Sequence, residues 1–572
     1  MLRPARIALF TAASVALTGS LAACGSGAGS SAGGSSDAFS AATCQGGTLR
    51  VLDSAKNSKG FDPAVLYTSG GGAIPRLLFR TLTTRQSVPG TDGTKVVPDL
   101  ATDTGKPSEN ATVWTYHLKP NLRFADGTPI TSADIKYGVE RSFSPQLAGG
   151  PPYLRDWLVG GADYQGPYGS GNTDLASVAT PDASTVVFHL RKSEGDFPYL
   201  AAETQFAPVP KAKDTGKEYN ADPVSSGPYT IAGFTKGREL DLVRNPHWSR
   251  SSDQQRLACP DRIEVSLGLS PAVINQRLSS SVGQDANAIT TDTSLDAPTL
   301  AKVSADPALK KRVVTGKFPQ IYYLAFDLKK APFDNQLVRE ALSYAVDRTA
   351  LVNAEGGTQL AVPSTTFTPE SLTAAHQDYD YFPAGATGNP EKAKQLLAQA
   401  GHPNGITVPL AYDTDDTSTG APAATALAQA FAKAGITLQL QPLGDADFSG
   451  TVNTPATQPA LSLTSWGADW PSGGPFLTPI FDGRQIVTGG GNFNLAQYND
   501  PAVNAQIDKI NQITDYATAQ KQWAALDAQL GKLALTVPLY EEATSVLYGS
   551  HVKNAYLDQW RGWYDIASVS VK

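Results

Sequence analysis

The sequence predicts a mixed α/β protein with a large core, and three observations support this prediction. First, 41% of the 572 residues are hydrophobic and 17% are charged, as in globular proteins and unlike disordered chains. Second, segments with the alternation typical of strands are interspersed with segments that have the period of helices. Third, residues 406–441 fit a strand–helix–strand unit with parallel strands. At roughly 150 residues per domain, this length corresponds to three or four domains.

The first half of the chain contains two strand signals and one helix signal. Both predicted strands alternate apolar and polar residues, with apolar residues at Trp114, Tyr116 and Leu118, and at Val186, Phe188 and Leu190. Asp126-Gly127 predicts a turn. The residues Thr131 to Asp134 have the form of a capping box, which predicts a helix from there to Arg141.

The second half contains the strand–helix–strand unit and the helix before it. Asn389-Pro390-Glu391 predicts a helix start, and Gly401 predicts its end. The next three segments are expected to be a strand, a helix and a strand, at Ile406 to Tyr412, Ala421 to Ala434 and Ile436 to Leu440. Two parallel strands joined by one crossover helix are the expected arrangement. No period of 20–50 residues repeats along the chain.

The N-terminus has the features of a secretory signal. Arg3 and Arg6 precede the apolar run from Ile7 to Leu17, which is too short to span a bilayer. Leu21-Ala22-Ala23-Cys24-Gly25 resembles a bacterial lipobox, so residues 1–23 are predicted to be a signal peptide and Cys24 the lipidated residue. The alternative is an ordinary signal peptide with an incidental cysteine.

A flexible tether is expected after the signal. Residues 24–45 are rich in Gly, Ser and Ala, a composition typical of linkers. No second run of 18 apolar residues occurs in the sequence. The lipid is therefore expected to hold the folded protein at the outer face of the cytoplasmic membrane.

The two other cysteines, Cys44 and Cys259, are expected to form a disulfide, because an exported chain enters an oxidising compartment. The alternative is two buried thiols. Both residues flank strand-like segments, Gly47 to Leu52 and Arg262 to Val265. The bond would join two strands more than 200 residues apart, so it predicts a domain built from non-contiguous pieces.

Several function classes are disfavoured by the sequence. The chain has 46 Lys and Arg against 53 Asp and Glu, so a nucleic-acid partner is not expected. Six scattered His without an HExxH motif, and one Met, give no metal site, and no cofactor is expected. A phosphate loop and a nucleophile elbow are absent. Two clusters of carboxylates could be considered as acid–base pairs, namely Glu541-Glu542 and the group of Asp413, Asp415 and Asp416. Adjacent carboxylates in a chain of this size more often lie at solvated edges of the protein. We therefore expect a protein that is not an enzyme.

The order of several short motifs resembles the extracytoplasmic solute-binding proteins of oligopeptide and dipeptide ABC importers, in particular actinobacterial lipoprotein members. The most specific block is Phe124-Ala125-Asp126-Gly127-Thr128-Pro129, followed by Ala133-Asp134-Ile135. Further matching motifs are Asp62-Pro63-Ala64, Leu78-Phe79-Arg80-Thr81-Leu82, Ser226-Gly227-Pro228-Tyr229, Trp466-Gly467-Ala468-Asp469-Trp470-Pro471 and Gln497-Tyr498-Asn499-Asp500-Pro501. The resemblance covers nearly all of the chain after the predicted signal.

The resemblance implies the two-lobed, periplasmic-binding-protein-like fold of the large peptide-binding type, in which lobes joined by a hinge close on a ligand. The implied lobe 1 core subdomain comprises residues 46–74, 198–290 and 538–572. The implied extra subdomain of lobe 1 comprises 75–197, and lobe 2 comprises 291–537. Cys44 and Cys259 would both belong to the discontinuous subdomain or its start.

The resemblance also implies ligand-binding residues. Asp469 stands between Trp466 and Trp470, and the matching Asp of peptide-binding members holds the α-ammonium of the ligand. A carboxylate walled by indoles is desolvated and favours a cationic partner. Trp466 and Trp470 are also expected to contact the ligand, and further ligand contacts are implied at Tyr67, Thr68, Ser69 and Tyr323. The alternative interpretations are a capping role for Asp469 and core packing for the aromatic residues.

These observations predict a lipid-anchored, monomeric receptor that captures oligopeptides between its lobes and delivers them to the permease subunits of an ABC importer. An oligosaccharide or glycoside receptor of the same fold is the first alternative, since Trp466 and Trp470 would also serve as sugar platforms. A surface-anchored hydrolase is the second alternative. Ala325 stands where some members carry an acid, so recognition of a peptide carboxylate is not implied.

Overall fold

The computed structural model describes residues 44, 46–56, 60–66, 73–147, 149–169, 171–291, 293–415 and 420–572. The predicted signal peptide, Cys24 and nearly all of the predicted tether lie outside the described residues. None of the described helices is both long enough and apolar enough to cross a membrane.

A five-stranded mixed sheet brings the start of the described chain beside a much later segment. Its strands, in spatial order, are β11 (Ala288–Thr290), β1 (Thr48–Leu52), β10 (Arg262–Ser266), β9 (Glu239–Arg244) and β8 (Tyr229–Thr235). β1 pairs in parallel with β10, with Thr48 opposite Arg262, and β1 also pairs in parallel with β11. The strands predicted beside the two cysteines are therefore neighbours.

The predicted disulfide between Cys44 and Cys259 is confirmed. The two Cα atoms lie 4.7 Å apart, and 215 positions separate the cysteines in sequence. Each cysteine lies a few residues before the start of its strand, Cys44 before β1 and Cys259 before β10. The bond therefore closes a long loop next to the first residues of this parallel pair. This confirms that a domain of this protein is built from non-contiguous segments.

The segment between β1 and β8 forms small antiparallel sheets covered by short helices. β4 (Lys106–Ser108), β5 (Val113–His117), β7 (Thr185–His189) and β6 (Val178–Asp182) form one sheet, and β2 (Thr83–Arg85) pairs with β3 (Val96–Pro98). The helices are α1 (Pro75–Leu78), α2 (Ser132–Arg141), α3 (Tyr153–Trp157) and α4 (Phe197–Leu200). The predicted strands around Trp114 and Phe188 are β5 and β7, and the capping box of Thr131 and Asp134 begins α2 as predicted.

A six-stranded sheet organises the later part of the chain. Its order is β13 (Ala361–Pro363), β17 (Thr536–Leu547), β12 (Val313–Phe326), β16 (Leu461–Gly467), β14 (Ile406–Asp413) and β15 (Ile436–Leu443). β14 and β15 are parallel and are joined through α11 (Gly420–Ala432), which confirms the predicted strand–helix–strand unit. α10 (Pro390–Gln399) starts after its cap Asn389, as predicted.

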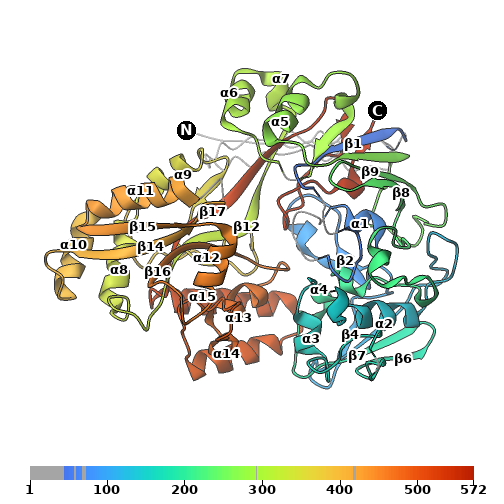
Figure 1. Ribbon diagram of the computed structural model, residues 1–572, viewed down its shortest axis with the longest axis horizontal. Coiled ribbons are helices and arrows are strands. Elements are labelled where there is room, and N and C mark those ends of the chain that lie inside the picture. Colours follow the sequence, from blue (N-terminus) through green and yellow to red (C-terminus); the bar gives the residue numbers. More distant parts are fainter. Residues whose placement is uncertain are drawn as a thin grey trace, which may run out of the picture. The chain divides into compact units, whose positions relative to one another are not determined.

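Helices cover both faces of this sheet (Figure 1). One face packs against α8 (Gln336–Ala345), α9 (Arg348–Ala354), α10 and α11, and the other against α12 (Asp445–Val452), α13 (Gly474–Phe481), α14 (Pro501–Asn511) and α15 (Tyr516–Gly531). β12 shows why both faces need cover. Leu324 and Phe326 enter the first core, whereas Ile321, Tyr323 and Ala325 enter the second, because successive side chains of a strand point to opposite faces.

We call this sheet with α8–α15 lobe 2, and the remaining described elements lobe 1. β12 and β17 run through both lobes. Val546 packs in the core of the five-stranded sheet, whereas Leu539 and Tyr540 pack in lobe 2. The pair β18 (Val552–Lys553) and β19 (Ser570–Val571) also belongs to lobe 1.

The domain boundaries predicted from the sequence stay predictions, but the cores favour a later start for lobe 2. α6 (Ala297–Ala305) and α7 (Pro307–Lys310) follow α5 (Pro271–Ser280), and Leu295 and Val303 share a core cluster with Ile274 of α5. Residues after 290 thus pack with lobe 1 until β12 enters lobe 2.

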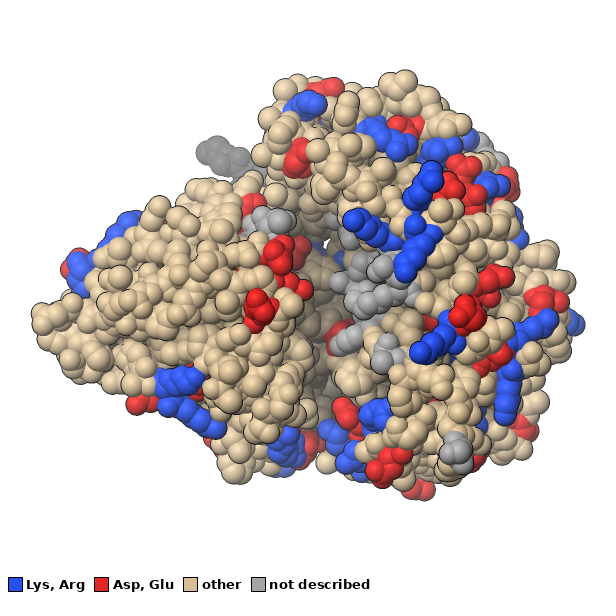
Figure 2. All heavy atoms as spheres, in the orientation of Figure 1, with Lys and Arg blue, Asp and Glu red and all other residues tan. Residues whose placement is uncertain are grey.

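Figure 2 shows that the surface is hollowed between the two lobes and that acidic side chains gather on the lobe 2 side of the hollow.

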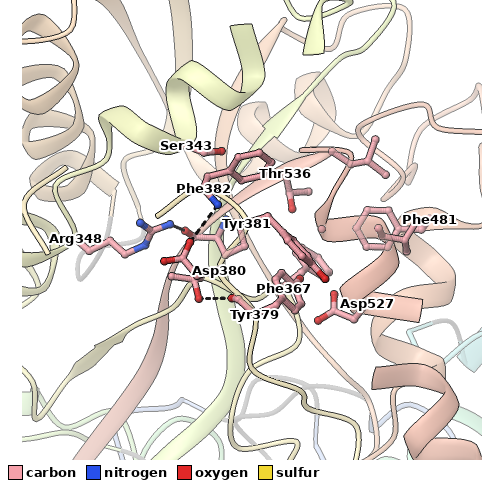
Figure 3. Close-up of a pocket in the computed structure, with 15 residues that line it drawn as sticks. Ser343, Arg348, Phe367, Tyr379, Asp380, Tyr381, Phe382, Phe481, Asp527 and Thr536 are labelled. Carbon is pink, nitrogen blue, oxygen red and sulfur yellow. Dashed lines mark hydrogen bonds between the residues drawn. The ribbon is translucent and has the colours of Figure 1, made fainter. Parts of the chain in front are cut away.

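Lobe 2 also contains a small cavity of about 20 Å³ between α15 and the segment from Thr365 to Phe382 (Figure 3). This volume holds about one water molecule, so it is not a ligand pocket. Asp527 of α15 lines the cavity beside Phe367 and Tyr379 and accepts a hydrogen bond from the backbone N–H of Thr368 at 3.1 Å. Burial raises the pKa of Asp527 to about 6.

The disulfide should stabilise the fold. Replacing both Cys44 and Cys259 with Ala should lower the free energy of unfolding by about 2–4 kcal/mol, because the long loop is no longer closed in the unfolded state. Urea unfolding of the variant measures this loss, and the wild-type protein with reductant is the matched control. Equal unfolding midpoints for the oxidised protein and the variant would contradict the prediction.

Asp527 should make stability depend on pH. Its pKa is raised from 3.8 to about 6 on folding, so the folded state favours the protonated form. Stability should therefore fall as pH rises from about 4 to about 6 and stay level above that range, a total effect on the order of 3 kcal/mol. Subtracting the curve of Asp527→Asn from that of the wild type isolates this effect in urea titrations at several pH values. If stability depends on pH in the same way in the wild type and in Asp527→Asn, the prediction is wrong. Asp447→Asn, which removes an exposed carboxylate, is the control.

Candidate functional site

The largest of the cavities described here lies where the lobes meet and has a volume of about 310 Å³. Both lobes contribute to its wall, with aromatic and charged side chains among the lining residues. These residues are Pro151, Tyr153, Glu203, Phe318, Pro319, Gln320, Gly467, Ala468, Asp469, Trp560, Arg561 and Trp563. The volume falls at the lower end of the range for small-molecule sites, about 300–1,000 Å³.

An interruption in strand pairing creates one wall of the cavity. The register of β12 against β17 shifts between Lys317 and Ile321, so Phe318, Pro319 and Gln320 leave the regular ladder. On the other side of β12, Gln320 stands opposite Gly467, the last residue of β16. The chain then continues through Ala468 and Asp469 into the cavity wall. The site is therefore built at the point where two neighbouring pairings of β12 end or break.

Asp469 lies at the cavity and connects the lobes. Its carboxylate accepts a hydrogen bond from the hydroxyl of Tyr153, in α3 of lobe 1. The side chain is only partly exposed, so its charge is incompletely hydrated. The structure therefore places Asp469 where a ligand between the lobes would meet it, and its role in ligand binding stays a prediction.

Trp470 has a packing role between the lobes. It is 2% exposed and lies in the core cluster of the four-stranded sheet of lobe 1. Its ring centroid is 4.8 Å from that of Tyr153 and 5.7 Å from that of Trp157, both edge to face. Its indole N–H donates to Asp196 Oδ2 at 3.0 Å. The predicted ligand contact of Trp470 remains untested, but its side chain is not among those that line the cavity.

A second contact brings the lobes together near Asp196. The backbone N–H of Gly195 donates to the carbonyl of Asn511 at 2.7 Å. A Cβ at Gly195 would lie 2.1 Å from the carbonyl oxygen of Ile513, so this close approach requires glycine. Burial raises the pKa of Asp196, while hydrogen bonds from Ser472 and Trp470 act in the opposite direction.

The other predicted site residues lie away from the cavity wall or outside the described chain. Trp466 is half-buried and packs on Phe493 with ring centroids 4.9 Å apart. Tyr323 is 2% exposed and packs edge to face on Phe367, and burial raises its pKa. Tyr67, Thr68 and Ser69 lie outside the described residues. The ligand roles of all five stay predictions.

The chain just before Tyr67 is held firmly. Both oxygens of the Asp62 carboxylate accept hydrogen bonds from the guanidinium of Arg141, at 2.8 and 2.9 Å, and both side chains are fully buried. The carbonyl of Leu66 accepts a hydrogen bond from the hydroxyl of Thr204. This bidentate pair fixes the chain that directly precedes the segment predicted to contribute Tyr67, Thr68 and Ser69.

Glu203 and Arg561 are charged residues of the cavity that the sequence did not reveal. Burial and the like charge of Asp469 raise the pKa of Glu203, while Arg561 and Arg85 oppose the shift. The guanidinium of Arg561 lies 5.9 Å from the ring centroid of Trp563. The position of Arg561 between Trp560 and Trp563 is a sequence pattern that could have indicated a binding surface. Glu203 belongs to no comparable local motif.

This arrangement is suited to binding. Aromatic walls with a few oppositely charged groups fix the orientation of a small ligand. No group of three or more His, Cys, Asp or Glu able to hold a metal occurs among the residues that the structure describes. The residues that line the cavity offer charged groups and apolar surface for contact with a ligand.

Comparison with known proteins agrees with this geometry. The profile of the family described as "Bacterial extracellular solute-binding proteins, family 5 Middle" matches residues 95–487, more than half of the chain. The periplasmic oligopeptide-binding protein OppA of Escherichia coli is 25% identical over 453 residues, which cover 76% of this chain and 77% of OppA. Heme-binding protein A of Haemophilus influenzae is 27% identical over 557 residues, which cover 91% of this chain and 92% of that protein.

A solved structure is similar in fold and sequence. The clavulanic acid biosynthesis oligopeptide binding protein 2 superposes with a TM-score of 0.85 at 35% sequence identity, covering 93% of this chain and 98% of that protein. The unliganded open form of the murein tripeptide binding protein MppA superposes with a TM-score of 0.73 at 22% identity, which concerns the fold alone. The two lobes with a cavity between them therefore follow a known architecture. The chain belongs to family 5 of the bacterial extracellular solute-binding proteins, a family of binding proteins and not of enzymes.

Proposed function

We propose that this protein captures short peptides with a free amino terminus in the cavity between its lobes and presents them to the permease subunits of an ABC importer. The observation that carries the proposal is Asp469, a partly desolvated carboxylate at the junction of the lobes within a cavity walled by Tyr153, Phe318 and Trp560. A carboxylate in such surroundings gains most from a cationic partner such as an α-ammonium group. Relatives named as oligopeptide-binding proteins support the same ligand class.

The aromatic wall supports a ligand with side chains rather than a small ion. Phe318, Trp560 and Trp563 present apolar surface beside the charged groups, which suits peptide side chains of varied shape. The volume of about 310 Å³ favours a short peptide.

We propose that the lobes move about the paired strands β12 and β17. The interrupted register between Lys317 and Ile321 lies between the part of β12 that pairs in lobe 1 and the part that packs in lobe 2. On this basis lobe 2 begins near residue 321 and ends near residue 541, later at both ends than the boundaries predicted from the sequence. Contacts such as that between Trp470 and Asp196 would open when the lobes separate.

We also propose a lipid anchor at Cys24. The order of basic residues, apolar run, small residues and cysteine supports it. The anchor would hold the protein at the outer face of the cytoplasmic membrane, within reach of a permease.

The ligand role of Asp469 can be tested with a four-part cycle. Asp469→Asn keeps the shape of the side chain and an acceptor for Tyr153 but removes the charge. Affinity for a tripeptide with a free amino terminus should fall roughly 100- to 1,000-fold, because breaking one partner of a buried charge pair typically costs about 3–5 kcal/mol. N-acetylation of the peptide should weaken wild-type binding by a similar factor and have little effect in the variant, since both changes remove one interaction.

Isothermal calorimetry measures all four affinities. The control is Asp163→Asn, which removes an exposed carboxylate of lobe 1 and should leave binding unchanged. If the losses of affinity caused by Asp469→Asn and by N-acetylation of the peptide simply add when both changes are made, Asp469 does not hold the amino terminus. If no member of a degenerate peptide library binds the wild-type protein, the peptide proposal is wrong.

Lipid anchoring has a separate test. Cys24→Ala should leave the protein without lipid and release most of it from the membrane fraction, because two or more acyl chains give the stable anchoring. Fractionation followed by immunoblotting measures this release. Tight membrane retention of the variant would refute the anchor at Cys24.

A further inference from the structure

Glu203 is a second carboxylate in the cavity between the lobes. It precedes the short 3₁₀ turn Thr204–Phe206 and is half-buried, and it lines the cavity together with Asp469. Its Oε1 atom is buried and has no hydrogen-bond partner in the part of the chain that the structure describes. A buried carboxylate oxygen without a partner is costly, so such an atom marks a position where a donor from outside the protein is favoured.

Among the described residues, no cation forms an ion pair with Glu203. Arg561 and Arg85 are near enough to influence its charge, but among the described residues neither forms an ion pair with it. Arg85 faces Asp558, with 3.9 Å between Nε and Oδ2. The Nε atom of Arg561 is itself buried and has no hydrogen-bond partner within the described ranges, and its guanidinium lies over Trp563. Glu203 thus lies near two guanidinium groups, but it has no direct partner for Oε1 among the described residues.

The charges of the cavity wall define the ligand that would complement them. The residues that line the cavity include two carboxylates, those of Asp469 and Glu203, and one guanidinium, that of Arg561. A single α-ammonium at Asp469 balances the net charge of this wall, but it leaves the buried Oε1 atom of Glu203 without a direct donor among the described residues. A ligand with a second cationic group satisfies both carboxylates.

Building on the proposed function, we propose that Glu203 binds a second cation of the ligand, the side chain of a basic first residue, so that the protein selects peptides beginning with Lys or Arg. The aliphatic stem of such a side chain would pack against the apolar wall formed by residues such as Phe318 and Trp560. Nearby aromatic faces favour a cation as well. Glu203 would then determine specificity, whereas Asp469 would hold the amino terminus common to all peptides.

Two peptides that differ in one charge test this proposal. Lys-Ala-Ala and norleucine-Ala-Ala have similar length and apolar content, but only the first carries a side-chain ammonium. Calorimetry with the wild-type protein should give about 10- to 100-fold tighter binding of Lys-Ala-Ala, the range expected for one charged hydrogen bond. Glu203→Gln should abolish this preference and leave the affinity for norleucine-Ala-Ala nearly unchanged.

Two further variants separate this proposal from the proposed function. Asp469→Asn should weaken both peptides by similar factors and keep the preference for Lys. Glu218→Gln removes an exposed carboxylate of lobe 1 and should change nothing. Thermal unfolding shows whether each variant is folded. The comparison of the two peptides on the wild-type protein tests the proposal even if Glu203→Gln does not fold.

The outcomes are distinct. Equal binding of both peptides by the wild-type protein overturns the role of Glu203 and leaves peptide capture intact. A preference for Lys that persists in folded Glu203→Gln also overturns it. Binding of neither peptide by the wild-type protein contradicts the proposed function, and with it the role of Glu203.

Discussion

The pairing of β12 with β17 is the constraint on which the site depends. These two antiparallel strands belong to the core of lobe 1 at one end and to the six-stranded sheet of lobe 2 at the other. Their ladder is interrupted between Lys317 and Ile321, and the residues freed there form a wall of the cavity. A regular ladder would have directed these side chains alternately to the two faces of the sheet. The same irregularity thus separates the lobe 1 part of the strand pair from the lobe 2 part and supplies part of the cavity wall.

The segment after β16 connects this wall to lobe 1. Asp469 accepts a hydrogen bond from Tyr153, and the next residue, Trp470, packs among lobe 1 aromatic side chains and donates to Asp196. Adjacent residues therefore have different tasks. One presents charge to the cavity, while the other is anchored by buried apolar area, which favours the approach of the lobes. The packing of this indole is therefore a contact between the lobes, and its predicted role in ligand binding stays untested.

Local signals predicted much of the fold. The capping box of Thr131 and Asp134, the cap at Asn389 and the parallel pair β14–β15 were all identified correctly, because caps and strand alternation depend on neighbouring residues. The disulfide followed from the compartment and the number of cysteines. The candidate site was predicted less completely. Asp469 was identified through resemblance, but Tyr323 and Trp466 pack away from the cavity wall, since an aromatic residue in a strand looks the same in sequence whether it faces a core or a ligand.

The sequence by itself determined the fold class, the family and the link between the first strand and a strand more than 200 residues later. These properties depend on composition, on local patterns and on motif order along the chain. Only the tertiary structure decided which side chains share the cavity. Glu203 and Arg561 are separated by more than 350 positions and have no common motif, and their proximity to Asp469 results from strands that cross between lobes. Long-range packing sets such distances, and a sequence pattern carries no measure of them.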